Sequence, residues 1–361
     1  MSKLRVGVIG AGSWTVASHL PNLLRRRDAG EIELAIVSRR NPEILSRIQD
    51  RFGFEQATTD WQDVIAATPD IIIVGSPPGL HHQHAKAALE AGAHVMCEKP
   101  FTIDPANAWD LEETVRRTDR QLFIAYGWNY RPMLVQAHRL MHVDGGIGHI
   151  EHVSMHMDSV TRELLSETGS YPLADPDAVP QPETWSRPET SGGGYGQAQL
   201  THLLGIVLWL TDLRGEAVFA LMSAPLDAKV ELHDAVALRF TNGAIGSMAG
   251  ASSHAFGVER QAVELRAVGD RGMFHLELRD NTLWRYRIDR GETRVELDRD
   301  AGAYDCVGPV DAVVDAALGR QPVNNSPAEL GARTVEILEA AYRSARSGLL
   351  ETVSTLDRGA V

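Results

Sequence analysis

Two patterns of hydrophobic and polar residues divide this chain of 361 residues. Up to about residue 125, short apolar runs alternate with stretches of helical periodicity, and Ile71–Val74 is a continuous β-branched run. Such a run is typical of a strand buried on both faces of a parallel sheet. The alternation predicts a doubly wound α/β fold. Its expected strands are 4–9, 31–37, 71–74, 94–97 and 121–125, and its expected helices are 16–27, 41–52, 61–68, 82–91 and 104–118.

From Ile150 onward the strands alternate polar and apolar residues, as in an antiparallel sheet with one wet face. Asn242-Gly243 predicts a hairpin between strands 235–240 and 244–249, and residues 269–272 predict a second between 261–268 and 273–278. Helical patterns return at 309–318 and 327–347. We therefore predict two domains. Residues 1–126 form the doubly wound α/β domain. Residues 127–361 form an α+β domain with a large, mostly antiparallel open sheet, whose C-terminal helix is free to pack back on the first domain.

Composition excludes several partners. Forty-three per cent of the residues are hydrophobic and the net charge is −13, which suits a globular protein and disfavours binding to nucleic acid. The longest apolar stretch, 203–210, is far shorter than the ~20 residues that span a membrane. Cys97 and Cys306 are too few for a disulfide framework. We expect a cytoplasmic protein with reduced thiols and no membrane segment.

A glycine pattern follows the first predicted strand. Gly10 suits a tight turn, and Gly12 allows a pyrophosphate to approach the N-terminus of the next helix, beside Ser13 and Trp14. The third glycine position holds Thr15, which implies slightly wider packing of strand and helix. This strand–turn–helix context predicts a dinucleotide site, whereas a glycine pattern alone is weak evidence.

The end of the second strand bears on which nucleotide binds. NAD enzymes usually carry an acidic residue there, which bonds the ribose 2′-hydroxyl. Here the strand ends Ser38-Arg39-Arg40, and these side chains suit a 2′-phosphate. The sequence therefore favours NADP(H) over NAD(H), although two arginines at a strand end are also compatible with simple solvation.

Two further segments suggest chemistry. Glu98-Lys99 follows a strand whose carboxyl end should face the ligand, and a lysine there can act as a general acid or base if burial lowers its pKa. The Pro- and Gly-rich segment 169–196 is too long for a passive connection, so we expect a functional loop.

These residues belong to a wider array that resembles the glucose–fructose oxidoreductase/inositol dehydrogenase/rhizopine-catabolism (Gfo/Idh/MocA) family. The resemblance rests on the segments 76–81, 88–100, 129–132, 185–194 and 340–345. It implies a Rossmann domain followed by an open-sheet domain, with activity on a ring carbon of sugars, cyclitols or nucleotide-linked sugars. It further implies that Lys99 is the catalytic lysine and that Ser76, Pro77, His81 and Glu98 lie near the cofactor. A helix cap is an almost equally good interpretation of His81.

One departure from the family pattern concerns the helix after the triple glycine. The family usually carries Asp-x-x-x-His there, and this chain has Ala198 and His202 at the two positions. Gln199 becomes the nearest polar neighbour of His202 toward the substrate, because positions three apart share a helix face. Without a carboxylate neighbour, His202 should stay neutral near pH 7. Tyr195 is a further proton-donor candidate.

The leading hypothesis is an NADP(H)-dependent oxidoreductase of a sugar-like ring alcohol or ketone, working as a homodimer or homotetramer. Lys99 and His202 are the catalytic candidates, and the substrate pocket is expected to be shaped by Trp128, Tyr130, Trp185, Tyr195 and Gln199. We predict no metal, because His142, His149, His152 and His156 follow strand alternation and lack a carboxylate–histidine motif. Two alternatives stay open: a regulator that binds NADP without chemistry, and a dehydrogenase or reductase of a non-sugar substrate.

Overall fold

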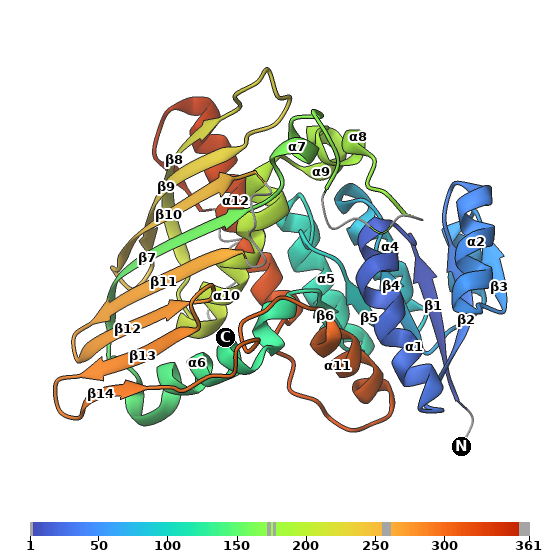
Figure 1. Cartoon of the computed structure of the whole chain (residues 1–361), viewed down its shortest axis with the longest axis horizontal. Coiled ribbons are helices and arrows are strands. Elements are labelled where there is room, and N and C mark those ends of the chain that lie inside the picture. The colour runs from blue at the N-terminus through green and yellow to red at the C-terminus, as the bar shows by residue number, and fades with distance from the viewer. Residues whose placement is uncertain (1–2, 172–174, 176–177, 255–260, 354–361) are drawn as a thin grey trace.

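The first half of the chain forms a six-stranded parallel sheet in the order β3-β2-β1-β4-β5-β6 (Figure 1). The computed structural model describes residues 3–171, 175, 178–254 and 261–353. All neighbouring strands of this sheet pair in parallel. The strands are β1 (Leu4–Ile9), β2 (Ile32–Ser38), β3 (Gln56–Thr58), β4 (Ile71–Val74), β5 (His94–Cys97) and β6 (Leu122–Ile124).

Helices cover both faces of the parallel sheet. On one face lie α1 (Leu20–Asp28), α2 (Pro42–Phe52) and α11 (Val307–Ala317), and on the other lie α3 (Trp61–Ala66), α4 (His81–Glu90) and α5 (Pro105–Thr118). Local sequence explains where several of them begin. Asn41, Asp60 and Asp104 each accept a backbone N–H of the first turn of the helix that follows, and Pro42 and Pro105 occupy the first positions of α2 and α5.

The second half forms a nine-stranded sheet in the order β14-β13-β12-β11-β7-β10-β9-β8-β15. Every pair in it is antiparallel except β7 with β10. The strands are β7 (Ile150–Ser159), β8 (Gly215–Ser223), β9 (His233–Phe240), β10 (Ile245–Ser252), β11 (Ala262–Gly269), β12 (Gly272–Glu277), β13 (Thr282–Arg287), β14 (Gly291–Arg294) and β15 (Glu351–Thr352).

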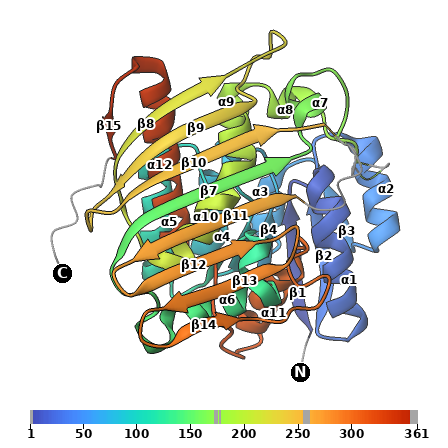
Figure 2. The same cartoon turned by 60° about the vertical axis from the view of Figure 1, so that its left-hand side comes forward.

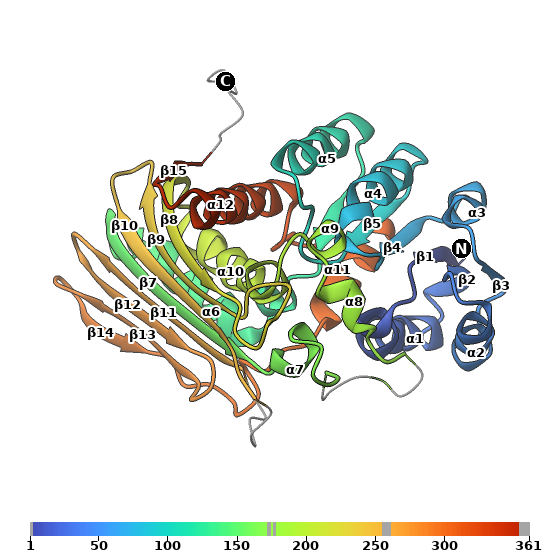
Figure 3. The ribbon, with the colours of Figure 1, turned by 90° about the horizontal axis from the view of Figure 1, so that it is seen from above.

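Helices fill the space between the two sheets (Figure 3). The central ones are α6 (Pro132–His142), α10 (Thr201–Thr211) and α12 (Ala328–Ser347), and short helices α7 (Arg162–Leu165), α8 (Pro182–Trp185) and α9 (Pro188–Ser191) lie near the loops that approach the parallel sheet. The helix α10 is buried almost all round, which its sequence LLGIVLWL explains. A single core cluster runs from Ile72 and Val95 of the first sheet through α10 and α12 to Val236 and Leu265 of the second.

One face of the nine-stranded sheet carries no helix within the described part of the chain (Figure 2). No helix of the described residues has both the length and the apolar character to cross a membrane.

The structure confirms the expected fold class and the two predicted hairpins. The run Ile71–Val74 is completely buried, with alternate residues in the clusters of the two opposite faces. Several details differ from expectation. The short strand β3 and the helix α6 were not anticipated, and α3 ends at Ala66 because Thr68 has a positive φ of 46°. Because α11 and α12 pack against elements of the first half, the domain boundary after residue 126 stays a prediction.

Candidate functional site

The glycine turn after β1 forms the floor of a cavity of about 690 Å³. Gly10 has a φ of +86°, and a Cβ there would lie 2.6 Å from the Ser76 nitrogen, so only glycine fits. A Cβ at Gly12 would meet nothing closer than 3.6 Å, and Gly12 lines the cavity. Thr15 is accommodated by a glycine opposite it: a Cβ at Gly75 would lie 2.1 Å from Thr15 Oγ1.

The end of β2 lines the same cavity with Ser38, Arg39 and Arg40. The Arg39 guanidinium donates to the Ala11 carbonyl and is partly buried, whereas Arg40 is exposed. Burial lowers the pKa of Arg39, and the charges of Arg40 and Arg47 lower it further. Among the described residues that line the cavity, Glu98 is the sole carboxylate, so this end of the cavity is strongly cationic.

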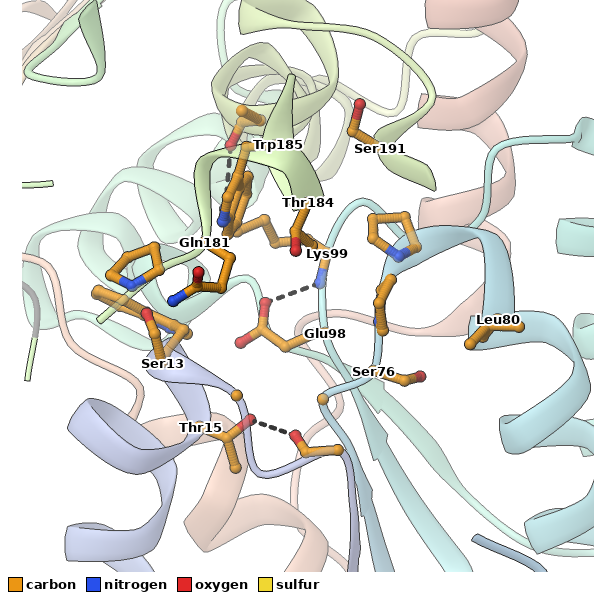
Figure 4. Close-up of a pocket in the computed structure, with 18 of the residues that line it drawn as sticks. Ser13, Thr15, Ser76, Leu80, Glu98, Lys99, Gln181, Thr184, Trp185 and Ser191 are labelled. Atoms are coloured by element: carbon orange, nitrogen blue, oxygen red, sulfur yellow. Dashed lines mark hydrogen bonds between the residues drawn. The ribbon is translucent and has the colours of Figure 1, made fainter. Parts of the chain in front are cut away.

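Lys99 stands after β5 between the glycine turn and the second half of the chain (Figure 4). Its Nζ donates to the carbonyl of Ala198 at 3.0 Å and lies 5.8 Å from the ring centroid of Trp185. Burial lowers the pKa of Lys99, and the negative charge of Glu98 opposes part of that effect. A lysine with a lowered pKa can exchange a proton nearer to neutral pH.

Glu98 is held by a histidine from a π turn, Thr15–His19, at the start of the first helix. His19 Nε2 lies 2.5 Å from Glu98 Oε1, and Glu98 Oε2 accepts the backbone N–H of Lys99 at 3.0 Å. Burial raises the pKa of Glu98, but the hydrogen bond and charge of His19, with the charge of Lys99, outweigh it and lower the pKa overall. Glu98 is therefore ionised beside Lys99. The sequence analysis did not identify His19.

His202 of α10 lines the cavity inside a group of aromatic rings. Its ring centroid lies 5.2 Å from that of Trp128 and 5.3 Å from that of Tyr304, both edge-on. Only 4% of His202 is exposed, and its Nδ1 has no hydrogen-bond partner among the described residues. Burial and the charge of Lys99 hold the pKa of His202 well below 6.5. This agrees with the expectation of a neutral imidazole near pH 7.

Most of the sequence-predicted residues meet in this one cavity. They are Gly10, Gly12, Ser13, Trp14, Ser38, Arg39, Arg40, Ser76, Pro77, Glu98, Lys99, Trp128, Trp185, Gln199 and His202. The described part of the long Pro- and Gly-rich segment also lines it, through Val179–Gln181, Thr184, Trp185 and Ser191.

Three predicted residues do not reach the cavity, and the structure corrects their assignment. Tyr195 is fully buried, and its hydroxyl donates to the Met157 carbonyl at 2.9 Å. The Tyr130 hydroxyl lies 2.8 Å from Ser326 Oγ. The His81 ring nitrogens lie 2.7 Å and 2.9 Å from the carbonyls of Ser76 and Pro100, so His81 connects the loop after β4 to the loop after β5. In each case a hydrogen bond to the scaffold turns the polar group away from the cavity.

Among the residues of the cavity wall that the sequence analysis missed are Tyr304 and His84. Tyr304 comes from the segment after β14 and packs on Trp14 and Trp128, and no local motif surrounds it. His84 lies one turn after His81 and bonds Ser76 Oγ at 2.9 Å, while burial and the His81 charge lower its pKa to about 4. Helical spacing from His81 could have identified it. Within the described residues, no three His, Cys, Asp or Glu side chains are grouped as for a metal ion.

Comparisons with known proteins agree with this geometry. Residues 4–126 match the family model "Oxidoreductase family, NAD-binding Rossmann fold", and residues 135–275 match the GFO/IDH/MocA C-terminal domain. The chain is 28% identical to the levoglucosan dehydrogenase of Pseudarthrobacter phenanthrenivorans over 329 residues, 81% of this chain and 79% of that protein.

Two further relatives have a cofactor in their descriptions. The D-xylose 1-dehydrogenase (NADP(+)) of Hypocrea jecorina is 31% identical over 144 residues, 39% of this chain and 37% of that protein. A levoglucosan dehydrogenase structure in complex with NADH and levoglucosan superposes with a TM-score of 0.77 at 21% identity, covering 98% of this chain and all of that one.

Proposed function

The chain belongs to the GFO/IDH/MocA family of oxidoreductases, and from this premise we propose that it transfers a hydride between a nicotinamide cofactor and a ring carbon of a sugar, cyclitol or glycoside. The ring carbon would carry a secondary alcohol or a ketone. One observation carries the proposal: a single cavity joins the glycine turn, the cationic end of β2, and the pair Lys99 and His202.

The residues present fit a dinucleotide. The open space beside Gly12 and the helix N-terminus after it suit a pyrophosphate, and Ser13 and Trp14 line the same wall. Ser76, Pro77 and Glu98 would hold the part of the cofactor nearest Lys99. When bound, the nicotinamide ring supplies the hydride acceptor or donor of the reaction.

Lys99 would act as the general base or acid toward the reacting hydroxyl group. In oxidation its neutral amine accepts that proton, and in reduction its ammonium group returns it. The ammonium group also stabilises negative charge on the substrate oxygen. His202, being neutral, would accept a hydrogen bond from a substrate hydroxyl and so orient the ring. Gln199, which both donates and accepts hydrogen bonds, would bind an adjacent hydroxyl.

We also propose that NADP(H) is preferred over NAD(H). Ser38, Arg39 and Arg40 line the cavity, and Arg47 lies close enough to lower the pKa of Arg39. Like charges that repel one another would be relieved by a phosphate dianion. The named relatives include an NADP(+) enzyme and a protein crystallised with NADH, so the preference has to be measured on this chain.

The decisive experiment is a turnover assay. Levoglucosan, myo-inositol, D-xylose and methyl glucosides would be offered with NAD+ and NADP+, and reduced cofactor would be followed by absorbance, with Lys99→Ala as the control. Turnover that depends on Lys99 supports the proposal. Cofactor binding without turnover on any sugar supports the regulator or the non-sugar enzyme instead, and a panel of non-sugar ring ketones separates those two.

We further propose a homodimer or homotetramer that associates through the uncovered sheet face. Leu221, Ile245, Met273 and Tyr286 are large apolar residues on that face, each more than two-fifths exposed. Large exposed apolar residues on an uncovered sheet face can mark a protein–protein interface. Light scattering should give a multiple of 39.5 kDa, and a monomer at micromolar concentration would contradict this.

Cys97 and Cys306, both buried and free, are compatible with the proposed cytoplasmic location.

A further inference from the structure

Two π turns meet at Glu98-Lys99, one from each half of the chain. The turn Thr15–His19 brings His19 to Glu98, and the turn Gly196–Leu200 brings the Ala198 carbonyl to Lys99 Nζ. A π turn inserts one extra residue into the helical ladder and is frequent at functional sites.

Two buried side chains hold the second turn in place. Glu231 accepts the backbone N–H groups of Gly194 and Gly196 at 2.9 and 3.0 Å, and the Tyr342 hydroxyl at 2.5 Å. The Gln197 N–H donates to the Tyr342 hydroxyl at 3.2 Å. Three backbone N–H donors of this segment are thus bonded to one carboxylate–phenol pair, contributed by the residue two before β9 and by α12.

Gly193 and Gly194 allow the backbone to approach Glu231 and Tyr342. A Cβ at Gly193 would lie 2.2 Å from the Tyr342 hydroxyl, and a Cβ at Gly194 would lie 2.1 Å from the Glu231 carbonyl oxygen. Only glycine lets the backbone approach Glu231 and Tyr342 this closely.

We propose that the Ala198 carbonyl, presented by a π turn that Glu231 and Tyr342 hold in place, orients Lys99 in the cavity. Glu231 and Tyr342 are then positioning residues, since neither lines the cavity. This inference rests on the proposed function only for the claim that Lys99 is catalytic.

An orienting group that is a backbone carbonyl leaves the net charge around Lys99 unchanged. A carbonyl accepts a hydrogen bond without bringing a full negative charge. The titratable groups that face Lys99 are Glu98 from its own strand end, Cys306 from the segment before α11, and His202 from α10. Burial outweighs Glu98 and Cys306 and lowers the pKa of Lys99, so the amine is available as a base at lower pH than an ordinary lysine.

The first test measures the pH at the titration midpoint of Lys99 in the absence of substrate. The chain has four lysines, Lys3, Lys86, Lys99 and Lys229, so NMR of [13Cε]lysine-labelled protein resolves each one. Ala198→Asp adds a carboxylate beside Lys99 and should raise its titration midpoint by about 1–3 pH units. The neutral isostere Ala198→Asn should shift it by less than half as much. Equal midpoints in both variants and the wild type would overturn the proposal.

The second test removes the support of the turn. Tyr342→Phe keeps the ring and deletes the hydroxyl that joins Glu231 to Gln197. We expect kcat to fall about tenfold with KM within twofold, because misplacing a catalytic group costs rate rather than binding. Tyr130→Phe is the matched control, since it deletes another largely buried hydroxyl, the one bonded to Ser326.

A kcat for Tyr342→Phe equal to that of Tyr130→Phe would contradict the positioning role. The same pair of variants can be compared by the Lys99 NMR signals. Lys99 Nζ lies 5.8 Å from the Trp185 ring centroid, so we expect its signals to move in Tyr342→Phe and to stay in place in Tyr130→Phe. If no sugar is turned over, the proposed function fails while these NMR measurements still decide this inference.

Discussion

The two ends of the cavity control charge in opposite ways. At the Lys99 end the ionisable groups are buried, and burial lowers the pKa of both Lys99 and His202. At the Ser38 end Arg39 is partly buried and Arg40 is exposed; burial lowers the pKa of Arg39, and the like charges of Arg40 and Arg47 lower it further. At the first end, burial shifts Lys99 and His202 toward their neutral forms before any ligand arrives, while Glu98 stays ionised. The second gathers charge that a ligand can neutralise.

This difference explains how one cavity can both support proton transfer and select between two cofactors. A proton-transfer group works best when its pKa lies near the working pH, which burial can arrange without a counter-ion. A phosphate-binding group should remain charged at every pH, which arginine does when it stays near water. Mutations at the Lys99 end should therefore affect rate, and those at the Ser38 end should affect cofactor choice.

The largest effect is expected from Lys99→Ala. Acid–base groups typically contribute about 10²–10⁴-fold, so kcat should fall by at least that lower bound while cofactor affinity changes only a few-fold. Steady-state kinetics and calorimetric titration of the cofactor measure both quantities. A variant that keeps more than about a tenth of the wild-type kcat would remove Lys99 from the mechanism.

A smaller effect is expected at the other end, from Arg40→Ser. A charge-assisted hydrogen bond contributes about 1.5–3 kcal/mol, so the NADP+ dissociation constant should rise about 10–100-fold. NAD+ lacks the 2′-phosphate and serves as the internal control, with little change expected. Arg40 is the better target because the Arg39 guanidinium already donates to Ala11. Wild-type protein that binds both cofactors equally would refute the preference itself.

His202→Asn should lower kcat about tenfold and leave the pH dependence in place. His202 is already neutral near pH 7, so replacing it removes no charge from Lys99. For alcohol oxidation, kcat/KM should rise with pH as Lys99 loses its proton and level off below 10.5, the ordinary lysine value. A midpoint that moves by a full pH unit in His202→Asn would show that His202 is charged in the free enzyme.

The smallest effect on catalysis is expected from Tyr195→Phe. Its hydroxyl bonds Met157 and Ser159 inside the core, so its loss should lower the free energy of unfolding by about 0.5–1.5 kcal/mol. Activity should stay within twofold. Urea unfolding and kinetics separate the two, and a tenfold loss of kcat without loss of stability would return Tyr195 to the substrate pocket.

Sequence patterns located the site well where neighbours in the chain are also neighbours in space. Gly10, Gly12 and Ser38–Arg40 each sit at the carboxyl end of a strand, and Lys99 follows β5 in the same way, so parallel strands bring them to one edge. Prediction failed where a residue's direction depends on packing. Tyr130 and Tyr195 lie beside cavity residues in the sequence, yet their hydroxyls bond Ser326 and Met157.

The sequence by itself determined the two-part architecture, the dinucleotide turn and the lysine, because hydrophobic period, glycine spacing and strand ends are local properties. Only the tertiary structure decided that His19 pairs with Glu98, that Tyr304 completes the wall beside His202, and that a backbone carbonyl meets Lys99. Each of these contacts joins segments far apart in the chain. Their formation depends on how two sheets pack around α10 and α12, and no local pattern encodes that packing.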